Sequence, residues 1–157
     1  MKKTCRTRGE GLDIVEAAHS KRVSSFLYCR MEIVGKIEPE RLKKAVRQSC
    51  KFVPEIIYTF DFRYCEFVDK GLTMDGVVMV ENGGRKSKKQ RSPCQEIWDL
   101  SSGPQFRIFI QEKEQGSKIV FAMSYILSDG KGFLQYLYLL IRLYHRKEQR
   151  QSNVLYK

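Results

Sequence analysis

The run from Ser124 to Gly130 (Ser-Tyr-Ile-Leu-Ser-Asp-Gly) places two hydroxyls, a phenol and a carboxylate between an apolar stretch and an amphipathic one. Tyr125 carries the phenol, and an unperturbed phenol has a pKa of about 10, which makes it a poor general base at neutral pH. Asp129 precedes Gly130, and aspartate before glycine favours a turn and the N-cap of a following helix. The residues alone therefore indicate a turn that starts a helix.

Patterns for other chemistry are missing from the sequence, which has no Ser-His-Asp order, no paired carboxylates at helical spacing and no phosphate-binding loop. The two histidines, His19 and His145, lie far apart in the chain. The five cysteines are scattered and form no CxxC pair: Cys5, Cys29, Cys50, Cys65 and Cys94. We therefore expect no metal site, and the scattered cysteines favour a reduced, cytoplasmic compartment.

Strand and helix patterns alternate around the turn. Residues 26–34 alternate between apolar and polar side chains, which predicts a strand with one exposed face. Residues 118–126 are largely apolar on both faces, which predicts a covered strand inside a sheet. Amphipathic helices are predicted over 39–51 and 132–147. The expected fold class is α/β (α+β): a two-layer sandwich of a mixed, mostly antiparallel sheet with helices on one face.

Each predicted helix has one apolar stripe. Pro39 suits a first helical position, and Pro54 disfavours helical geometry just before it, so the first helix is bounded on both sides. Its stripe consists of Leu42, Ala45, Val46, Ser49 and Cys50. The stripe of the second helix consists of Phe133, Leu134, Leu137, Leu140, Ile141 and Tyr144.

Three more segments predict strands. Residues 105–111 form a hairpin pattern with 118–126, and residues 76–80 are short and apolar. Residues 56–68 are aromatic-rich and predict one long strand or two short ones. The aromatic side chains there cannot all face one core, because neighbouring strand residues point to opposite sides: Tyr58, Phe60, Phe62, Tyr64 and Phe67. An exposed apolar patch of this kind would mark an interface.

The chain is strongly basic, with 29 lysines and arginines against 18 acids and a net charge of +11. The densest run, residues 83–91, has five cations, two glycines and no aromatic residue, which predicts an exposed loop. No nucleic-acid recognition motif accompanies it, so we expect no nucleic-acid partner. The uncharged run 132–141 is too short to cross a bilayer, and no signal peptide is visible, so we expect no membrane partner.

A chain of 157 residues predicts one domain. We expect a poorly ordered segment over 1–21, a folded unit over 22–148 and a frayed tail over 149–157.

Several segments between residues 22 and 146 share motifs, in order, with one protein superfamily. Residues 37–46 (IEPERLKKAV) resemble its first helix, and residues 52–56 (FVPEI) and 103–108 (GPQFRI) resemble motifs that lead into strands. The run from Ser124 to Gly130 resembles its HHxxxDG region, and residues 132–137 resemble the helix that follows. The superfamily is that of the CoA-dependent acyltransferases, which includes chloramphenicol acetyltransferase, nonribosomal peptide synthetase condensation domains and alcohol acetyltransferases.

The resemblance implies a chloramphenicol-acetyltransferase-like half-domain. Members are longer, with two similar halves and an active site in the groove between them, and this chain resembles the N-terminal half. The folded unit 22–148 would then be an acyltransferase-like N-terminal subdomain. A second copy of the chain, or a separate second-half protein, would be its partner, and two-fold pairing is the commonest oligomer.

The HHxxxDG motif is degenerate here. Tyr125 stands where the resemblance implies the histidine that acts as general base, and Ser124 stands where the motif has its first histidine. Tyr125 has three interpretations: a strand-end aromatic, a remnant position that only binds, or a working catalytic tyrosine. Asp129 and Gly130 match, and the resemblance implies a structural salt bridge from Asp129 to an arginine. Ile57 holds the corresponding arginine position, and Arg107 is an alternative partner.

The expected function is that of a half-domain of a CoA-dependent acyltransferase, of the alcohol acetyltransferase or condensation type, which is inactive as an isolated chain. Acetyl-CoA or another acyl-CoA would be a co-substrate, with no tightly bound cofactor. The alternative is a non-catalytic binding or assembly module whose basic surface takes an acidic partner.

Overall fold

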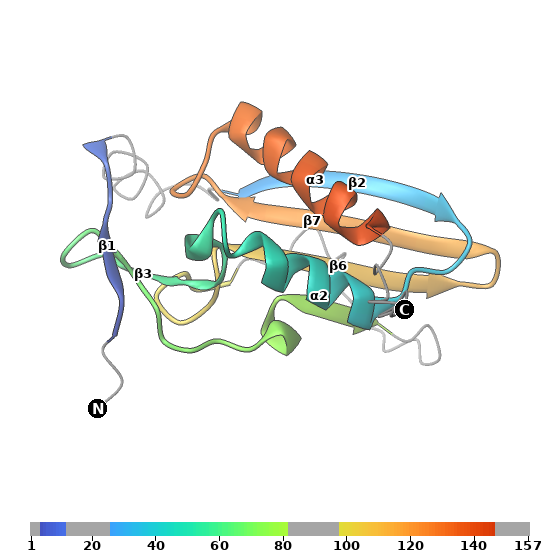
Figure 1. The fold of residues 1–157 in the computed structure, drawn as a ribbon, viewed down its shortest axis with the longest axis horizontal. Helices are drawn as coiled ribbons and strands as arrows, with labels where there is room; N and C mark the ends of the chain where they lie inside the picture. The colour runs from blue at the N-terminus through green and yellow to red at the C-terminus, as the bar shows by residue number, and fades with distance from the viewer. Residues whose placement is uncertain (1–3, 12–25, 82–97, 147–157) are drawn as a thin grey trace, which may run out of the picture.

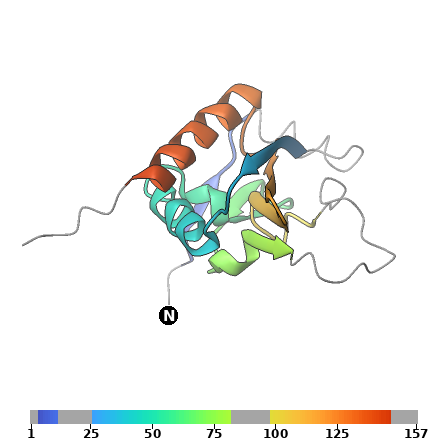
Figure 2. The ribbon, with the colours of Figure 1, turned by 90° about the vertical axis from the view of Figure 1, so that its right-hand side faces the viewer.

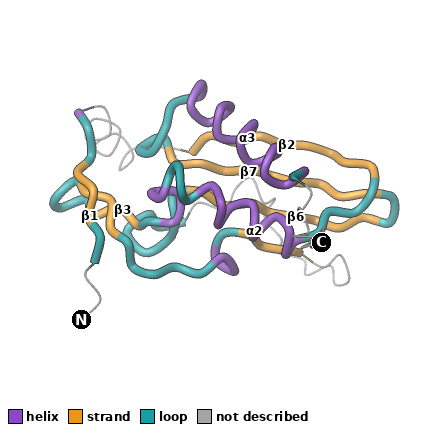
Figure 3. The backbone as a smooth tube through the Cα atoms, viewed as in Figure 1, coloured by secondary structure: helices purple, strands orange, loops and turns teal. Residues whose placement is uncertain are grey.

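The computed structural model describes residues 4–11, 26–81 and 98–146 (Figures 1 and 3). The predicted basic loop over 83–91, the tail over 149–157 and most of the segment 1–21 lie outside these residues. None of the described helices is both long enough and apolar enough to cross a membrane.

The main sheet has four strands in the order β2-β7-β6-β5. These strands are β2 (Phe26–Val34), β5 (Val78–Glu81), β6 (Phe106–Lys113) and β7 (Gly116–Ser124). All neighbours are antiparallel except β5 and β6, which run parallel. β7 lies inside the sheet, and its Phe121 and Met123 are buried, as the apolar pattern predicts. Gly116 is required at the hairpin, because a Cβ there would collide with the carbonyl oxygen of Ile33 on β2.

Two helices, α2 (Pro39–Ser49) and α3 (Gly130–His145), cover one face of this sheet (Figures 1 and 2). The hydroxyls of Ser49 and Tyr136 hydrogen-bond across the helix pair at 2.8 Å, and both side chains are buried. At the other end, the Arg41 guanidinium lies over the Tyr144 ring at 5.0 Å. These contacts make α2 and α3 antiparallel neighbours. The predicted two-layer, mostly antiparallel α/β arrangement is confirmed.

The buried face of α3 differs from the predicted stripe. Leu134 is 55% exposed and Ile141 is 38% exposed, whereas Tyr136 is buried. Residues 133, 136, 137 and 140 follow the i, i+3, i+4, i+7 spacing of one helix face, and Leu134 and Ile141 lie on the side of it away from α2. The sequence has more apolar positions on α3 than the sheet and α2 can cover.

A second, small sheet has the order β1-β4-β3, with strands β1 (Arg6–Arg8), β3 (Thr59–Asp61) and β4 (Glu66–Val68). The segment 56–68 thus contains two short strands, preceded by a 3-10 turn over Pro54–Ile57; another 3-10 turn, Met74–Gly76, precedes β5. β1 lies in the segment predicted to be poorly ordered. It forms because β4 pairs with it and the Arg6 guanidinium bonds the Glu66 carboxylate at 3.1 Å.

The small sheet carries its own apolar cluster. Tyr58, Phe60 and Phe67 are buried in it, together with Phe26 and Ile126. These three residues do not face the main core, as expected, but a second core receives them, so the expected exposed apolar patch does not include them. Tyr64 is the member that remains clearly exposed, at 59%.

Candidate functional site

The HHxxxDG-like turn begins where β7 ends, at Ser124. The Ser124 side chain is buried, and its backbone N–H donates to the Gln105 carbonyl at 2.8 Å. Its hydroxyl oxygen accepts a hydrogen bond from the backbone N–H of Ile126 at 3.1 Å, and its carbonyl accepts from Leu127 and Ser128. These bonds end the strand two residues before the predicted end at 126 and fold the chain into a tight turn.

Tyr125 lies in this turn and points partly into solvent, with 39% of its surface exposed. Tyr125 directly follows Ser124, the last residue of the largely buried strand β7. Ile126 is the residue of the turn that is fully buried, in the cluster beside the small sheet.

Asp129 is the N-cap of α3. Its Oδ1 accepts a hydrogen bond from the backbone N–H of Gly132 at 2.8 Å, which satisfies one of the free donors at the helix start. A Cβ at Gly132 would collide with the Ser128 hydroxyl, which would have to rotate away. Gly130, by contrast, has open space around its Cβ position. The aspartate therefore has a structural role that needs no arginine.

Neither of the two positions considered for the family arginine, Ile57 and Arg107, forms a salt bridge with Asp129 among the described residues. Ile57 is half-buried between the two apolar clusters. The Arg107 Nε donates to the Gly76 carbonyl at 3.0 Å, and its guanidinium lies 4.8 Å from the centre of the Trp98 ring. The suggestion that Arg107 replaces the family arginine is wrong, because these contacts hold it against Gly76 and Trp98.

An apolar pocket of about 310 Å³ opens beside the turn, between the start of α3 and residues 53–56. Its polar wall is formed by Ser128, Gln135 and Tyr136, and Met123 and Leu127 are among its apolar residues. Burial raises the pKa of the Tyr136 hydroxyl, and the Ser49 hydrogen bond opposes that rise. Tyr136 is thus a neutral hydrogen-bonding group in the wall of this pocket and has no general-base character at neutral pH.

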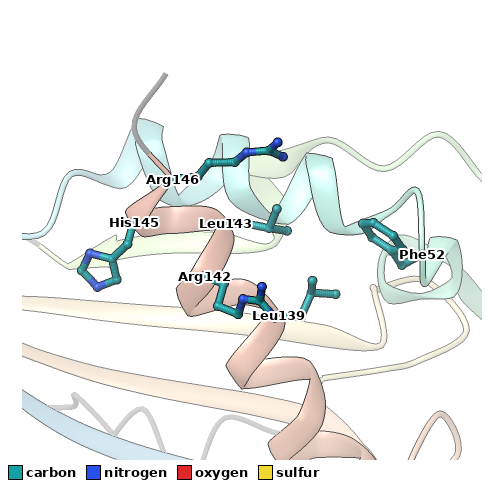
Figure 4. A pocket seen from close by; sticks show the side chains of 6 residues that line it. All are labelled: Phe52, Leu139, Arg142, Leu143, His145 and Arg146. Atoms are coloured by element: carbon teal, nitrogen blue, oxygen red, sulfur yellow. The ribbon is translucent and has the colours of Figure 1, made fainter. Parts of the chain in front are cut away.

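A second, open cleft of about 680 Å³ lies at the other end of α3 (Figure 4). Phe52, Leu139 and Leu143 line it, and the guanidiniums of Arg142 and Arg146 flank them. His145 also belongs to this cleft, and its ring points away from Phe52 in the close-up. It is the last residue of α3, whereas Asp129 caps the first turn, so His145 cannot replace the missing histidine of the turn.

No group of three or more metal-ligating side chains occurs in the part of the chain that the structure describes.

No family model matches this sequence, and no curated protein matches it. Solved structures do match, at low identity. The tallysomycin biosynthesis protein TlmII superposes with a TM-score of 0.65 over 89% of this chain, at 14% identity. The X-domain from teicoplanin biosynthesis superposes with a TM-score of 0.68 over 92% of this chain, at 12% identity. The starter condensation domain of rhizomide synthetase RzmA superposes with a TM-score of 0.62 over 91% of this chain, at 16% identity.

The chain has a condensation-domain-like fold. It spans only 37%, 33% and 37% of the lengths of these three chains, which is little more than a third of each. The sequence resemblance to the CoA-dependent acyltransferases is confirmed as a resemblance of fold. The condensation-like half places Ser124, Tyr125 and Asp129 in one turn, as their spacing predicts.

The sequence alone did not predict the surroundings of two residues near this turn. The sequence pattern places Gly132 in the helix motif but does not show that its Cβ position lies against the Ser128 hydroxyl. Gln105 is buried at the start of β6, where its amide nitrogen donates to the Tyr58 carbonyl at 3.2 Å. Its side-chain oxygen has no hydrogen-bond partner among the described residues. The motif Gly103-Pro104-Gln105 predicts that Gln105 lies at the start of a strand, but it does not predict that the side chain is fully buried.

Proposed function

We propose that this chain is a condensation-like half-domain that transfers no acyl group on its own and acts by binding another protein chain. The observation that carries the proposal is the residue at position 125. The family resemblance implies a histidine base there, and this chain has a partly exposed tyrosine. General-base catalysis typically contributes ~10² to 10⁴-fold to a rate, so its loss removes most of the expected activity.

The rest of the turn supports the same proposal. Asp129, Ser124 and Gly132 are all engaged in hydrogen bonds or close packing that build the turn and start α3. These interactions keep the architecture of the motif without its proton-transfer chemistry. Acetyl-CoA or another acyl-CoA would be a co-substrate only in an assembly that supplies the missing base.

Partner binding has a precedent among the matched structures. One of them is a complex of the X-domain and OxyB from teicoplanin biosynthesis, which superposes with a TM-score of 0.65 at 10% identity. A protein with this fold can therefore be found in complex with another protein. By analogy, this chain would bind a second copy of itself or a separate second-half protein.

Measuring release of free CoA from acetyl-CoA in the presence of simple alcohols or amines tests the proposal. We expect the purified chain to show no turnover above background, and Tyr125→Phe to behave identically, since the phenol has no catalytic role. Turnover by the wild type that is abolished in Tyr125→Phe would overturn the proposal. Circular dichroism of both proteins ensures that folded chains are compared.

A second candidate function is binding of an acidic ligand at the cleft that ends α3. Arg142 and Arg146 flank its apolar side chains, and neither forms an ion pair with another described residue. Guanidiniums beside an apolar floor suit a carboxylate-rich, partly apolar partner. Saturable binding of an acidic peptide that is lost in Arg142→Glu, but kept in Lys131→Glu at the other end of α3, would support this candidate.

A further inference from the structure

The outer edge of β2 and the apolar stripe of α3 beside it form one continuous surface. β2 is the outermost strand of the four-stranded sheet, and among the described residues no strand pairs with its second edge. Its nine residues make it as long as the central strand β7. A long edge strand is a template for pairing with another chain.

The stripe of α3 consists of Leu134, Tyr138 and Ile141, which are 55%, 71% and 38% exposed. Their i, i+4, i+7 spacing puts them on one side of the helix. The opposite side of α3 contacts α2 through Tyr136, so the stripe faces away from α2 and toward the side on which β2 lies (Figure 1).

An apolar groove joins the two features. It has a volume of about 260 Å³ and is lined by Met31 and Ile33 of β2 and by Ile141 of α3, among others. The apolar surface therefore runs from the edge strand across the groove to the exposed side of the helix. A partner that pairs with β2 would at the same time cover the stripe.

The charges of β2 indicate what that partner is. The strand carries one cation, Arg30, and one anion, Glu32, on the same face. The Glu32 carboxylate lies 3.5 Å from the Lys113 ammonium of its own chain, and 75% of its side chain remains exposed to a partner. Opposed residues of an antiparallel pair lie on the same face of a sheet, and opposite charges there stabilise the pair while like charges destabilise it. A strand with one charge of each sign, two residues apart, is complementary to its own antiparallel copy.

We propose that two copies of this chain pair through β2 about a two-fold axis at Met31. In this register Arg30 of each copy faces Glu32 of the other, and Cys29 faces Ile33. Moving the axis to Arg30 or Glu32 would oppose two like charges, and a one-residue change of register would turn the apolar face to the wrong side. The pairing would extend the sheet across both copies and bring the two α3 stripes to the same interface.

Net charge opposes this dimer. Each copy carries +11, and Lys131 and Arg142 border the stripe on α3. Ions screen that repulsion over a Debye length of about 8 Å at physiological salt, whereas strand pairing and apolar contact act at shorter range. The dimer should therefore persist, and its formation should not be weakened by moderate added salt.

The proposed dimer rests on the proposed role of the chain in binding another protein chain, and it names the partner. Different experimental results would contradict the dimer and the absence of acyl transfer. Analytical ultracentrifugation of the full chain at tens of micromolar should give twice the chain mass of 18.4 kDa. A monomer mass at every salt concentration would overturn the dimer and leave the absence of acyl transfer intact. Acyl turnover would overturn the proposed function and leave the dimer intact.

Charge reversal tests the register. R30E and E32R should each weaken dimerisation by about tenfold or more, because each opposes two like-charged pairs at the axis. The double variant R30E/E32R should recover the wild-type dissociation constant. K51E, at the end of α2, matches the charge change of R30E away from the edge and should not weaken the dimer. Equal effects of R30E and K51E would overturn the pairing.

Cross-linking gives an independent measurement. Cα atoms of opposed residues lie within the span of a disulfide bond. Under mild oxidation, M31C should link to itself between copies, and I33C should link to the native Cys29 of the other copy. Mass spectrometry identifies the linked peptides. The wild-type chain, oxidised in the same way, is the control for disulfide bonds that the native cysteines form. A dimer in which neither variant forms its expected link would overturn the β2 interface.

Discussion

The carboxylate of Asp129 accepts a hydrogen bond from the backbone N–H of Gly132 at 2.8 Å, and this bond starts the helix α3. The DG part of the motif thus persists in this chain with a local structural reason. The turn also forms with Ser124 and Tyr125 at the two histidine positions of the motif, since the Ser124 hydroxyl and carbonyl accept the hydrogen bonds that close it. The start of α3 therefore depends on Asp129 and not on a histidine at position 125.

Removing the cap should destabilise the chain. Asp129→Ala deletes the acceptor for Gly132, and losing an N-cap of this kind costs about 1 kcal/mol of unfolding free energy. Asp129→Asn retains an oxygen acceptor and should lose much less. Urea unfolding followed by the fluorescence of Trp98, the single tryptophan of the chain, measures both variants. Equal losses in the two variants would mean that the carboxylate charge, and not the cap, stabilises the turn.

The two glycines of the turn should respond differently to substitution by alanine. Gly130→Ala places a methyl group in open space and should stabilise the helix by up to about 1 kcal/mol. Gly132→Ala forces the Ser128 hydroxyl to rotate and breaks its exposed bond to the Asp129 carbonyl, so it should stabilise the helix less than Gly130→Ala does. The difference between the two unfolding free energies is the quantity to measure. In a Ser128→Ala background this difference should shrink, and an unchanged difference would contradict the collision.

The central elements were predictable because their patterns have only one structural solution. β7 is apolar on both faces and must be covered, and α2 has a single apolar stripe between two prolines. Both were correctly assigned from the sequence, within two residues at their ends. The turn from Ser124 to Gly130 was also placed correctly, since it falls between a strand and a helix that are unambiguous.

The missed features depend on contacts that distant residues supply. β1 consists of Arg6, Thr7 and Arg8, which have no apolar periodicity, and it becomes a strand because β4 provides a partner. On α3 the apolar positions spread over more than half of the helix surface, so the sequence could not say that Tyr136 is buried and Leu134 exposed. The Ser49 hydroxyl decides this, because it satisfies the Tyr136 hydroxyl inside the core.

Tyr125→Phe should leave the fold unchanged. The tyrosine is partly exposed, and its hydroxyl has no hydrogen bond to another described residue. Such surface substitutions usually change the unfolding free energy by less than about 0.5 kcal/mol. Tyr136→Phe serves as the contrasting variant, since it removes a buried hydroxyl bonded to Ser49 and should cost about 1 kcal/mol. A large loss in Tyr125→Phe would show that the phenol has a structural partner.

Alkaline pH should destabilise the chain through Tyr136. Burial raises the pKa of its hydroxyl above the ordinary value, and burial raises the pKa of Tyr58 to about 12. As the pH rises above about 10, the unfolded chain releases these protons before the folded chain does. The unfolding free energy therefore falls in that range, by up to about 1.4 kcal/mol per pH unit for each group, and is unaffected by them at neutral pH.

Tyr136→Phe should remove one of these contributions. Between pH 9 and 11 its unfolding free energy should fall less steeply than that of the wild type, even though the variant is less stable at pH 8. Tyr138→Phe is the matched control, because Tyr138 is 71% exposed on the same helix, and its slope should equal that of the wild type. Urea titrations at each pH give these slopes. A slope in Tyr136→Phe equal to that of the wild type would mean that the Tyr136 hydroxyl reaches water in the folded chain, and that the contact with Ser49 does not enclose it.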